Sequence, residues 1–582
     1  MAEIHADGGP LPPFPDDLTI AQFIMDTHHP LRPVRDRLRP WLIEEDTGRE
    51  VGSDELRTRT FGLANALKTR WNIGEDDVVC LFSPNHIDRA SNPHRAVHKL
   101  GAIVTTANPS FTRDEITYQL QLTKSCMVFA HSTNLSIALE AARAVGIPVD
   151  RVIVLDSAPN HKDTPSVQVL VVEGLREVQN FSERRLEQGE AKRKLAFLLF
   201  SSGTTGKPKA VMITHYAVIA NLVQNGQYMQ LTGDKIPPQD LIFRPESVVL
   251  LVSYIPYLDA YGLLFVLFSG LAYGATILVS QGFQLERALN SIERYRVTHL
   301  CFVPPMAVLL CKSPVVRDYD LSSVRYFFVG AAPVSVELTD QLVRVLPKTC
   351  KIGQGYGMTE TATMISFMRL DLRVGTPGSA GVLLPGYAAR VVKQDGTLAG
   401  FNEPGELHLK GPSLALGYLN NPQATAETFK DGWLATGDEV IINERKEIFI
   451  SDRIKELIKV RAFQVAPAEL EGLLLNHPDV ADVCVVGIPD PYSGELPLAF
   501  AVPTPDARTR VERNAEERAK VKAGIMEYVA KHKVYYKRLA GVEFVHTIPK
   551  NPSGKLLRRI LRDKARNMLA SGELTVASKA KL

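Results

Sequence analysis

Small hydroxyl residues, glycines and lysines are concentrated in one short run of the sequence, FSSGTTGKPKAVM at residues 200–212. Glycine can take positive φ, so several backbone N–H groups can point into one concavity, while hydroxyl and ammonium groups add donors. The spacing differs from the G-x-x-x-x-G-K-[ST] of a Walker loop. A flexible loop would have a similar composition, but the apolar run LAFLLF before it favours a phosphate-binding turn that contains Ser202, Gly203, Thr204, Thr205, Gly206 and Lys209.

A second run, GQGYGMTE at residues 353–360, combines three glycines with Thr359 and Glu360. Glycines allow close backbone approach, and a threonine hydroxyl can donate to a phosphate oxygen. A carboxylate is the kind of hard oxygen ligand that Mg²⁺ prefers. Taken alone, the run is equally typical of a glycine-rich turn.

Two further runs contribute an acid and a lysine. Asp438, in GWLATGDE, can accept hydrogen bonds from both hydroxyls of a ribose, as acidic residues do in other nucleotide sites. Lys555, in NPSGKLLRR, follows a Pro-Ser-Gly turn that predicts an exposed loop. Each feature is unremarkable by itself, and it is their order along one chain that indicates nucleotide chemistry.

The composition limits the possible partners. Apolar residues make up 45% of the 582 residues, and the net charge of +3 indicates no general attraction to nucleic acid. The six cysteines form no CxxC pair, which argues against a zinc ribbon or a disulfide framework and fits a reducing compartment. The N-terminal residues lack a secretory pattern. The final tripeptide, Ala580-Lys581-Leu582, is similar to the S-K-L address, so we expect peroxisomal import through its receptor, and otherwise a cytoplasmic protein.

One uncharged stretch, residues 260–279, is long enough to span a membrane. Three glycines interrupt it, and the β-branched run ATILV follows the last of them. We therefore expect a buried helix followed by a strand, and no transmembrane segment.

Helical patterns alternate with short apolar runs as far as about residue 450, which predicts an α/β fold with a parallel sheet covered on both faces. Residues 53–71 and 283–296 are clear helix candidates. Residues 381–411 predict β-hairpins around Asp395-Gly396. After about residue 453 the pattern changes to a small α+β unit, with a joint near Asp452-Arg453.

Together these runs resemble the acyl-adenylate-forming (AMP-binding) superfamily, and within it the branch of 4-coumarate:CoA ligases and acyl-CoA synthetases. The resemblance covers residues 40–570 and includes VGAAPVS, LKGPSLALGYLNNPQAT and FQVAPAELEGLLLNHPDVADVCVVGIPD. It implies a large N-terminal domain of two αβ sheets plus a β-barrel-like subdomain, with a small, mobile C-terminal domain. The implied organisation is an extension (1–40), an adenylation domain (41–452), a C-terminal domain (453–570) and a tail (571–582).

The resemblance also implies roles for individual residues in an ATP-dependent acid:CoA ligase. Residues Ser201 to Lys209 would hold the β- and γ-phosphates, Thr359 would bind phosphate, and Glu360 would bind Mg²⁺. Lys555 would bridge the attacking carboxylate and the α-phosphate, and Lys459 would serve the transfer of the acyl group to coenzyme A. The remaining nucleotide-binding candidates are Gln354, Gly355, Asp438, Arg453, Lys455 and Gln464.

The acid itself stays open between an aryl acid, of cinnamate or phenylacetate type, and a medium-chain fatty acid. Two alternatives also stay open: an adenylating enzyme that does not use coenzyme A, and a degenerate scaffold that binds nucleotide. The candidate acyl-pocket residues permit either acid, and they are Tyr257, Asp259, Tyr261, Gly330, Ala331, Ala332, Gly355 and Met364.

The sequence departs from the family pattern in four places, of which the replacement of a common glycine by Ala210, after Lys209, is the mildest. Asp259 replaces a histidine before the substrate pocket, and an ionised aspartate there would repel an incoming carboxylate. Arg461 and Ala462 replace lysine and glycine on the coenzyme A path, so a β-carbon would narrow that path. Residues 89–95 are polar where the family has an apolar helix, which predicts charge against a core. His94 and His98 have the spacing of a zinc helix, but Arg95 stands where that motif needs glutamate, and we expect no metal there.

Overall fold

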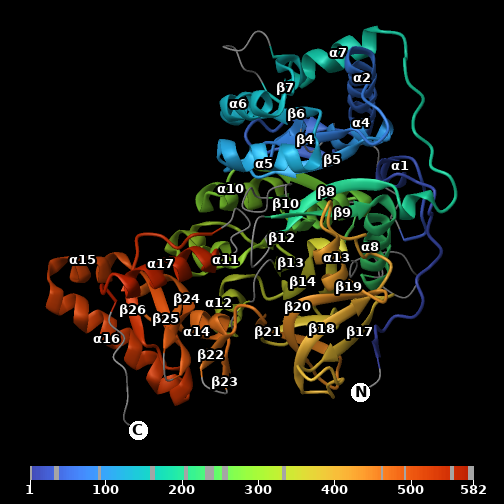
Figure 1. Cartoon of the computed structure of the whole chain (residues 1–582). Helices are drawn as coiled ribbons and strands as arrows, with labels where there is room; N and C mark the ends of the chain where they lie inside the picture. Colours follow the sequence, from blue (N-terminus) through green and yellow to red (C-terminus); the bar gives the residue numbers. More distant parts are fainter. Residues whose placement is uncertain are drawn as a thin grey trace.

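The protein consists of three β-sheets with helices packed against them in the computed structural model (Figure 1). The structure describes residues 3–31, 39–88, 93–156, 164–201, 208–229, 242–244, 246–251, 260–330, 334, 336–460, 463–490, 493–550 and 556–574. Sheets of six and fifteen strands form the larger N-terminal part, and a five-stranded sheet forms the smaller C-terminal part. The predicted α/β fold with a large and a small unit is confirmed.

The six-stranded sheet has the strand order β7-β6-β4-β5-β8-β9. It is parallel up to β8, and β9 lies antiparallel to β8 at the edge. Strands of a parallel sheet are covered on both faces, which explains their uncharged sequences. The elements are β4 (Val78–Phe82), β5 (Ile103–Ala107), β6 (Met127–Ala130), β7 (Val152–Val154), β8 (Leu195–Ser201) and β9 (Lys209–Thr214), with helices α2 (Ser53–Trp71), α4 (Pro93–Lys99), α5 (Arg113–Thr123), α6 (Leu135–Val145) and α7 (Val167–Arg176).

The fifteen-stranded sheet has a parallel half and an antiparallel half. The parallel half runs β14-β13-β12-β10-β11-β2, and β3 pairs antiparallel with β2 at its edge. It comprises β2 (Leu42–Glu44), β3 (Glu50–Val51), β10 (Val248–Leu251), β11 (Thr276–Val279), β12 (His299–Phe302), β13 (Tyr326–Val329) and β14 (Lys351–Met358), with helices α8 (His215–Tyr228), α10 (Leu285–Tyr295), α11 (Pro304–Lys312) and α12 (Val336–Val345).

The antiparallel half continues the same sheet through β14, so the β-rich part is not a separate sheet. The first residues of β14 pair parallel with β13, and its last residues pair antiparallel with β15. The turn at Asp395-Gly396 joins β17 to β18, as predicted. This half comprises β1 (Ile4–His5), β15 (Thr363–Phe367), β16 (Ser379–Leu383), β17 (Ala388–Val392), β18 (Pro404–Lys410), β19 (Phe429–Lys430), β20 (Trp433–Ile442) and β21 (Glu447–Arg453), with helix α13 (Pro422–Thr428).

The uncharged stretch at residues 260–279 forms buried elements of the large unit. It contains a π-helix (Tyr261–Ser269), the short helix α9 (Gly270–Ala272) and the strand β11, which confirms a buried helix followed by a strand. A β-carbon at Gly270 would lie 2.5 Å from Cδ1 of Ile277, so any larger residue there would displace the end of that β11 side chain. In the described part of the chain, no helix has the length and hydropathy that a bilayer span requires.

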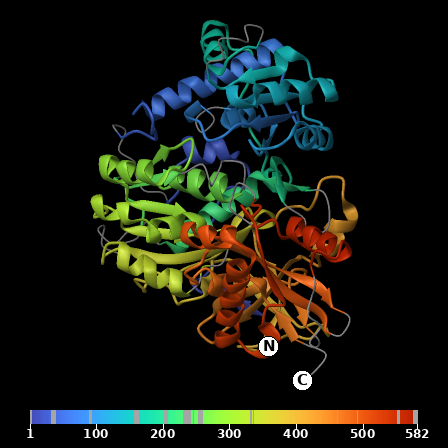
Figure 2. The same cartoon turned by 90° about the vertical axis from the view of Figure 1, so that its left-hand side faces the viewer.

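The smaller unit packs helices on both faces of its sheet, which has the order β23-β22-β25-β24 with β26 beside β25. One apolar cluster lies under α14 and α16, and another lies under α17. Figure 2 shows this unit, in orange and red, on one side of the large unit. Its elements are β22 (Ile458–Val460), β23 (Phe463–Val465), β24 (Val480–Asp490), β25 (Gly494–Pro503), β26 (Gly541–Phe544), α14 (Pro467–Leu474), α15 (Pro505–Arg513), α16 (Ala515–His532) and α17 (Arg558–Ala570).

Residues 454–457 connect the large sheet to the small one. Oδ2 of Asp452, on the large sheet, accepts a hydrogen bond from the backbone N–H of Ala468, on α14, at 3.1 Å. The guanidinium of Arg558 forms ion pairs with Glu456, in the connection, at 2.5 Å and with Glu471, on α14, at 2.6 Å. The Arg558 side chain is only 10% exposed. One buried cation thus ties α17 to both α14 and the connection.

Helix α4 confirms the expectation of charge against a core. Arg95 is 2% exposed, and His94 and His98 are equally buried. Nε2 of His98 lies 3.0 Å from the carbonyl oxygen of Ala196, and its ring meets the buried ring of His215 at 4.8 Å. Burial lowers the pKa of His98 to about 4.

We expect acid to destabilise the fold through His98. An unfolded histidine takes up a proton near pH 6.5, whereas folded His98 resists protonation down to about pH 4, so stability falls across that interval as the pH is lowered. His98→Gln should flatten the dependence of the thermal midpoint on pH, and the exposed control His5→Gln should not. An unchanged slope in His98→Gln would contradict this account.

Arg558→Leu should destabilise the smaller unit by about 3–5 kcal/mol, because it leaves the buried carboxylates of Glu456 and Glu471 without a cation. The measurement is hydrogen exchange at the amides of β24 and β25. Arg559→Leu, at the exposed neighbouring position, is the matched control and should cost less than about 1 kcal/mol. Equal exchange in the two variants would argue against a structural role for Arg558.

Candidate active site

The hairpin of β8 and β9 holds both ends of the predicted phosphate loop. Ser201, the last residue of β8, is the register partner of Lys209, the first residue of β9. Nζ of Lys209 lies 4.7 Å from the ring centre of Tyr418. The lysine charge is therefore held against an aromatic face at the base of the loop.

Glu360 lies in a single 3₁₀ turn, Thr359–Thr361, directly after β14. Its side chain is buried, and Oε1 accepts a hydrogen bond from the hydroxyl of Tyr418 at 2.9 Å. Within the described residues, no hydrogen bond reaches Oε2. A buried carboxylate with one oxygen engaged fits Mg²⁺, which is commonly held by one or two carboxylates together with substrate phosphates.

The glycines of GQGYGMTE allow close backbone approach within the chain itself, at β15 and Met368. A β-carbon at Gly357 would lie 1.8 Å from the carbonyl oxygen of Thr363, and one at Gly355 would lie 2.6 Å from Cε of Met364. A β-carbon at Gly353 would lie 2.3 Å from Sδ of Met368. These glycines let β14 lie directly on β15, and so fix where the strand ends.

Asp438, on β20, is held by side chains from two other strands of the same sheet. Its Oδ2 accepts a 2.5 Å hydrogen bond from the hydroxyl of Tyr356, on β14, and its Oδ1 lies 3.3 Å from Nε of Arg453, its register partner on β21. Burial and the adjacent Asp438 raise the pKa of Tyr356 well above its usual range, so this hydroxyl remains a donor. Asp438 keeps lone pairs for two further hydrogen bonds, as a ribose requires.

The two carboxylate clusters belong to one electrostatic site. Burial lowers the pKa of Arg453, but the charges of Asp438 and Glu360 are among those that outweigh this effect and leave the pKa raised. The charge of Arg453 therefore interacts with both acids, and its guanidinium contacts Asp438 directly. The structure thus brings together Lys209, Glu360, Asp438 and Arg453, four residues predicted from separate motifs.

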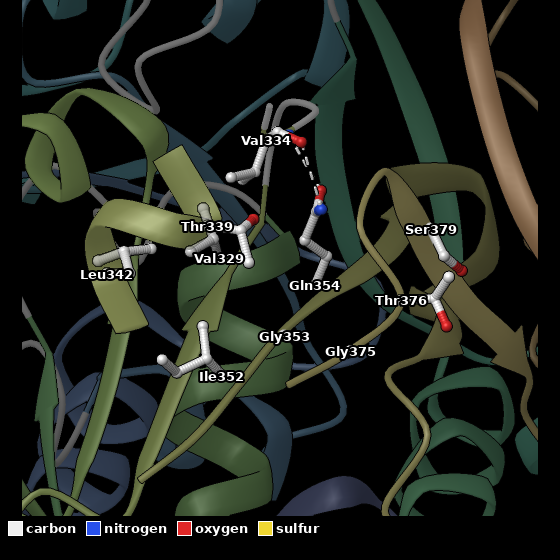
Figure 3. Close-up of a pocket in the computed structure, with 10 residues that line it drawn as sticks. All are labelled: Val329, Val334, Thr339, Leu342, Ile352, Gly353, Gln354, Gly375, Thr376 and Ser379. Atoms are coloured by element: carbon white, nitrogen blue, oxygen red, sulfur yellow. Dashed lines mark hydrogen bonds between the residues drawn. The ribbon is translucent and has the colours of Figure 1, made fainter. Parts of the chain in front are cut away.

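Gln354 uses its side chain to fix a neighbouring loop. Its Oε1 accepts a hydrogen bond from the backbone N–H of Val334 at 3.0 Å, beside a small cavity (Figure 3). The amide points towards Val334, while Thr376 and Ser379 lie on the opposite side, beyond Gly375. The cavity is lined by Val329, Val334, Thr339, Leu342, Ile352, Gly353, Gln354, Gly375, Thr376 and Ser379.

The described acyl-pocket candidates lie along one aromatic wall. A β-carbon at Gly330 would lie 3.1 Å from Cζ of Tyr261, so that ring covers the glycine. Tyr261 stacks on Phe265, whose ring centre is 6.1 Å from that of Phe367. Gly355 contributes to the same wall, because a β-carbon there would lie 3.2 Å from Cδ2 of Phe367. The Gly355 contact described above also places Met364 there.

Three further predicted nucleotide-binding residues follow the large sheet, in the connection and in the smaller unit. Lys459, on β22, is exposed and is the register partner of Gln464, on β23. Lys455 belongs to the connection between the sheets. No hydrogen bond or ion pair between described residues joins any of these three to Glu360 or Asp438.

Several predictions fall on positions whose structure is not described. They concern the phosphate loop, part of the acyl pocket, the coenzyme A path, the C-terminal lysine and the terminal tripeptide. These positions are Ser202, Gly203, Thr204, Thr205, Gly206, Tyr257, Asp259, Ala331, Ala332, Arg461, Ala462, Lys555, Ala580, Lys581 and Leu582.

Sequence reasoning missed Tyr356 and Tyr418, which hold the two carboxylates. Both lie inside runs that the sequence singled out, GQGYGMTE and LALGYLNNPQAT. Their partners are 82 and 58 residues away, so no local pattern signals the contacts.

Comparison with known proteins agrees with this geometry. The model of the AMP-binding enzyme family matches residues 35–419, and that of the AMP-binding enzyme C-terminal domain matches residues 469–555. 4-Coumarate–CoA ligase 3 of Arabidopsis thaliana is 36% identical over 531 residues, which cover 90% of this chain and 88% of that protein. 4-Coumarate-CoA ligase 1 of Narcissus pseudonarcissus is 36% identical over 537 residues, covering 90% of each chain.

A solved structure is similar over almost the whole chain. The anthranilate CoA ligase AuaEII in complex with anthranoyl-AMP matches with a TM-score of 0.80, at 23% identity, over 96% of this chain and 99% of that one. At 23% identity the structural similarity establishes only the fold. Membership of the family is established by the family models and by the relatives that are 36% identical. This chain belongs to the AMP-binding enzyme family.

Proposed function

We propose that this protein joins a carboxylic acid to coenzyme A through an acyl-adenylate. A carboxylate oxygen attacks the α-phosphorus of ATP, and pyrophosphate leaves with the bonding electrons. The thiolate of coenzyme A then attacks the acyl carbon, and AMP leaves. The observation that carries the proposal is the convergence of Lys209, Glu360, Asp438 and Arg453 on one site in a chain whose relatives are 4-coumarate–CoA ligases.

The described residues support distinct roles in the first step. Lys209 would bind the β- and γ-phosphates together with the loop that it ends, and Thr359 would donate to a phosphate oxygen. Asp438 would accept hydrogen bonds from the ribose, with Arg453 holding the carboxylate in place. Glu360 would hold Mg²⁺, which when bound neutralises phosphate charge.

Two lysines would serve the two steps in turn. Lys555 would stabilise the charge that builds at the α-phosphate, and Lys459 would face the site once the smaller unit has rotated. Arg461 and Ala462 would lie on the coenzyme A path. Peroxisomal import stays a prediction from the terminal tripeptide, Ala580-Lys581-Leu582.

The acid is best matched by an aryl carboxylate of cinnamate or phenylacetate type. The described acyl-pocket candidates adjoin a cluster of aromatic rings formed by Tyr261, Phe265 and Phe367, and an aryl group packed against such rings would gain stabilisation beyond its buried area. A medium-chain fatty acid would gain only the burial of its methylene groups.

Purified protein with ATP and Mg²⁺ should release AMP when given aryl acids, and loss of free thiol should accompany release when coenzyme A is present. The measurement is a panel of aryl and fatty acids, scored for AMP and for thiol. AMP release without thiol loss would indicate an adenylating enzyme that does not use coenzyme A. If no acid in the panel led to cleavage of the α–β bond, the proposal would be wrong.

Asp438→Asn should weaken the preference for ATP over 2′-deoxy-ATP. The amide keeps the size of the side chain and its contact with Tyr356, but it loses an acceptor for a ribose hydroxyl. The ratio of kcat/KM for the two nucleotides should fall by roughly tenfold, since a hydrogen bond to a charged group is worth about 1.5–3 kcal/mol. Glu444→Ala, at an exposed position six residues further on, is the control. An unchanged ratio in Asp438→Asn would exclude ribose binding by this carboxylate.

A further inference from the structure

Tyr418 belongs to a segment that is fixed along β9. The backbone N–H of Leu419 donates to the carbonyl oxygen of Ala210 at 2.8 Å, and that of Met212 donates to Gly417 at 2.9 Å. Tyr418 itself forms an antiparallel bridge with Val211 and is 7% exposed. These bonds leave its backbone little freedom beside the β8–β9 hairpin.

This tyrosine contacts both a proposed phosphate ligand and the proposed metal ligand. Its hydroxyl donates to Oε1 of Glu360 at 2.9 Å, and Nζ of Lys209 lies 4.7 Å from the centre of its ring. The same segment holds the backbone of the acid, because the N–H of Ala415 donates to the carbonyl oxygen of Glu360 at 2.8 Å. Glu360 is thus fixed at its main chain and at one carboxylate oxygen.

The direction of the hydrogen bond follows from the two groups, because a carboxylate oxygen accepts and a phenol hydroxyl donates. A protonated phenol donates to the carboxylate and draws Oε1 towards it. This leaves Oε2 as the oxygen available to a cation.

A metal site with few protein ligands depends on the orientation of each one. Among the described residues there is no group of three or more His, Cys, Asp or Glu side chains that could hold a metal ion. Mg²⁺ demands near-ideal octahedral geometry, so Glu360 contributes affinity only if its oxygen is held in the correct direction. Side chains that orient a metal ligand typically change metal affinity 10–100-fold when they are altered.

We propose that Tyr418 is a positioning residue that orients the Glu360 carboxylate towards the Mg²⁺ of bound ATP and keeps the Lys209 ammonium beside it. The inference rests on the proposed function and names a residue that the motif chemistry does not supply. The Tyr418 side chain would thereby set the distance between Mg²⁺ and the Lys209 ammonium, which both contact the triphosphate of ATP.

The test is equilibrium binding of ATP to Tyr418→Phe, measured by titration calorimetry in excess Mg²⁺ and in EDTA. Phenylalanine keeps the ring face for Lys209 but removes the hydroxyl. The affinity in EDTA should therefore match that of the wild type, while the gain on adding Mg²⁺ should fall roughly tenfold. A full Mg²⁺-dependent gain in Tyr418→Phe would overturn the proposal.

Tyr228→Phe is the matched control, because its hydroxyl also donates over 2.9 Å, to the neutral carbonyl oxygen of Met368. It should leave both affinities unchanged. In a Glu360→Gln background, Tyr418→Phe should cause no further loss, since the two changes remove one interaction. Independent, additive losses would overturn the proposed pairing.

The same titration separates this inference from the proposed function. A wild-type protein that gains no affinity from Mg²⁺ would overturn the metal site and the role of Tyr418. Acid-dependent AMP release would still stand in that case, because it is measured separately.

Discussion

The close packing of β14 against β15 determines where the site residues stand. The glycines of β14 let its backbone approach β15 more closely than any side chain would permit, and a β-carbon at Gly357 would collide with the carbonyl oxygen of Thr363. The strand can then pair with β13 at one end and with β15 at the other. Because β14 joins the parallel and antiparallel halves of the sheet, its last residues deliver Tyr356 and Glu360 to the seam between them.

The pairing of Asp438 with Arg453 at this seam orients the Asp438 carboxylate more than it stabilises the folded protein. Taking two ions out of water costs several kcal/mol per ion, which largely cancels their attraction. Asp438 and Arg453 occupy facing positions on adjacent strands, and Tyr356 adds a third contact from β14. The carboxylate is therefore held in one direction before any nucleotide binds, so less ordering has to occur on binding.

The sequence predicted those parts of the fold that depend on local patterns. Helix α2 runs over residues 53–71, as predicted, because acidic residues follow its start and Asn72 ends it in a left-handed conformation. Glu360 and Asp438 were found because their neighbours form recognisable motifs. The continuity of the fifteen-stranded sheet and the contacts of Tyr356 and Tyr418 were not predictable, since they depend on pairing between strands distant in sequence.

Contacts of residues 454–457 show where the chain passes from the large unit to the small one. In the part of the chain that the structure describes, the apolar clusters of the large and small units share no residue. Ile454 still belongs to the large sheet, because its N–H donates to the carbonyl oxygen of Gly437 at 3.0 Å. Glu456 contacts both units, because its N–H donates to the carbonyl oxygen of Arg453 at 2.8 Å and its carboxylate pairs with Arg558.

Residues 454–457 are thus the segment between the two sheets, so a rotation of the small unit would turn the backbone within them. Such a rotation would break polar interactions, for example the hydrogen bond between Asp452 and Ala468, and water can replace these at little net cost. Each apolar core would stay intact. The two-step reaction proposed for this protein needs that separation of a rigid nucleotide site from a unit that can change its orientation.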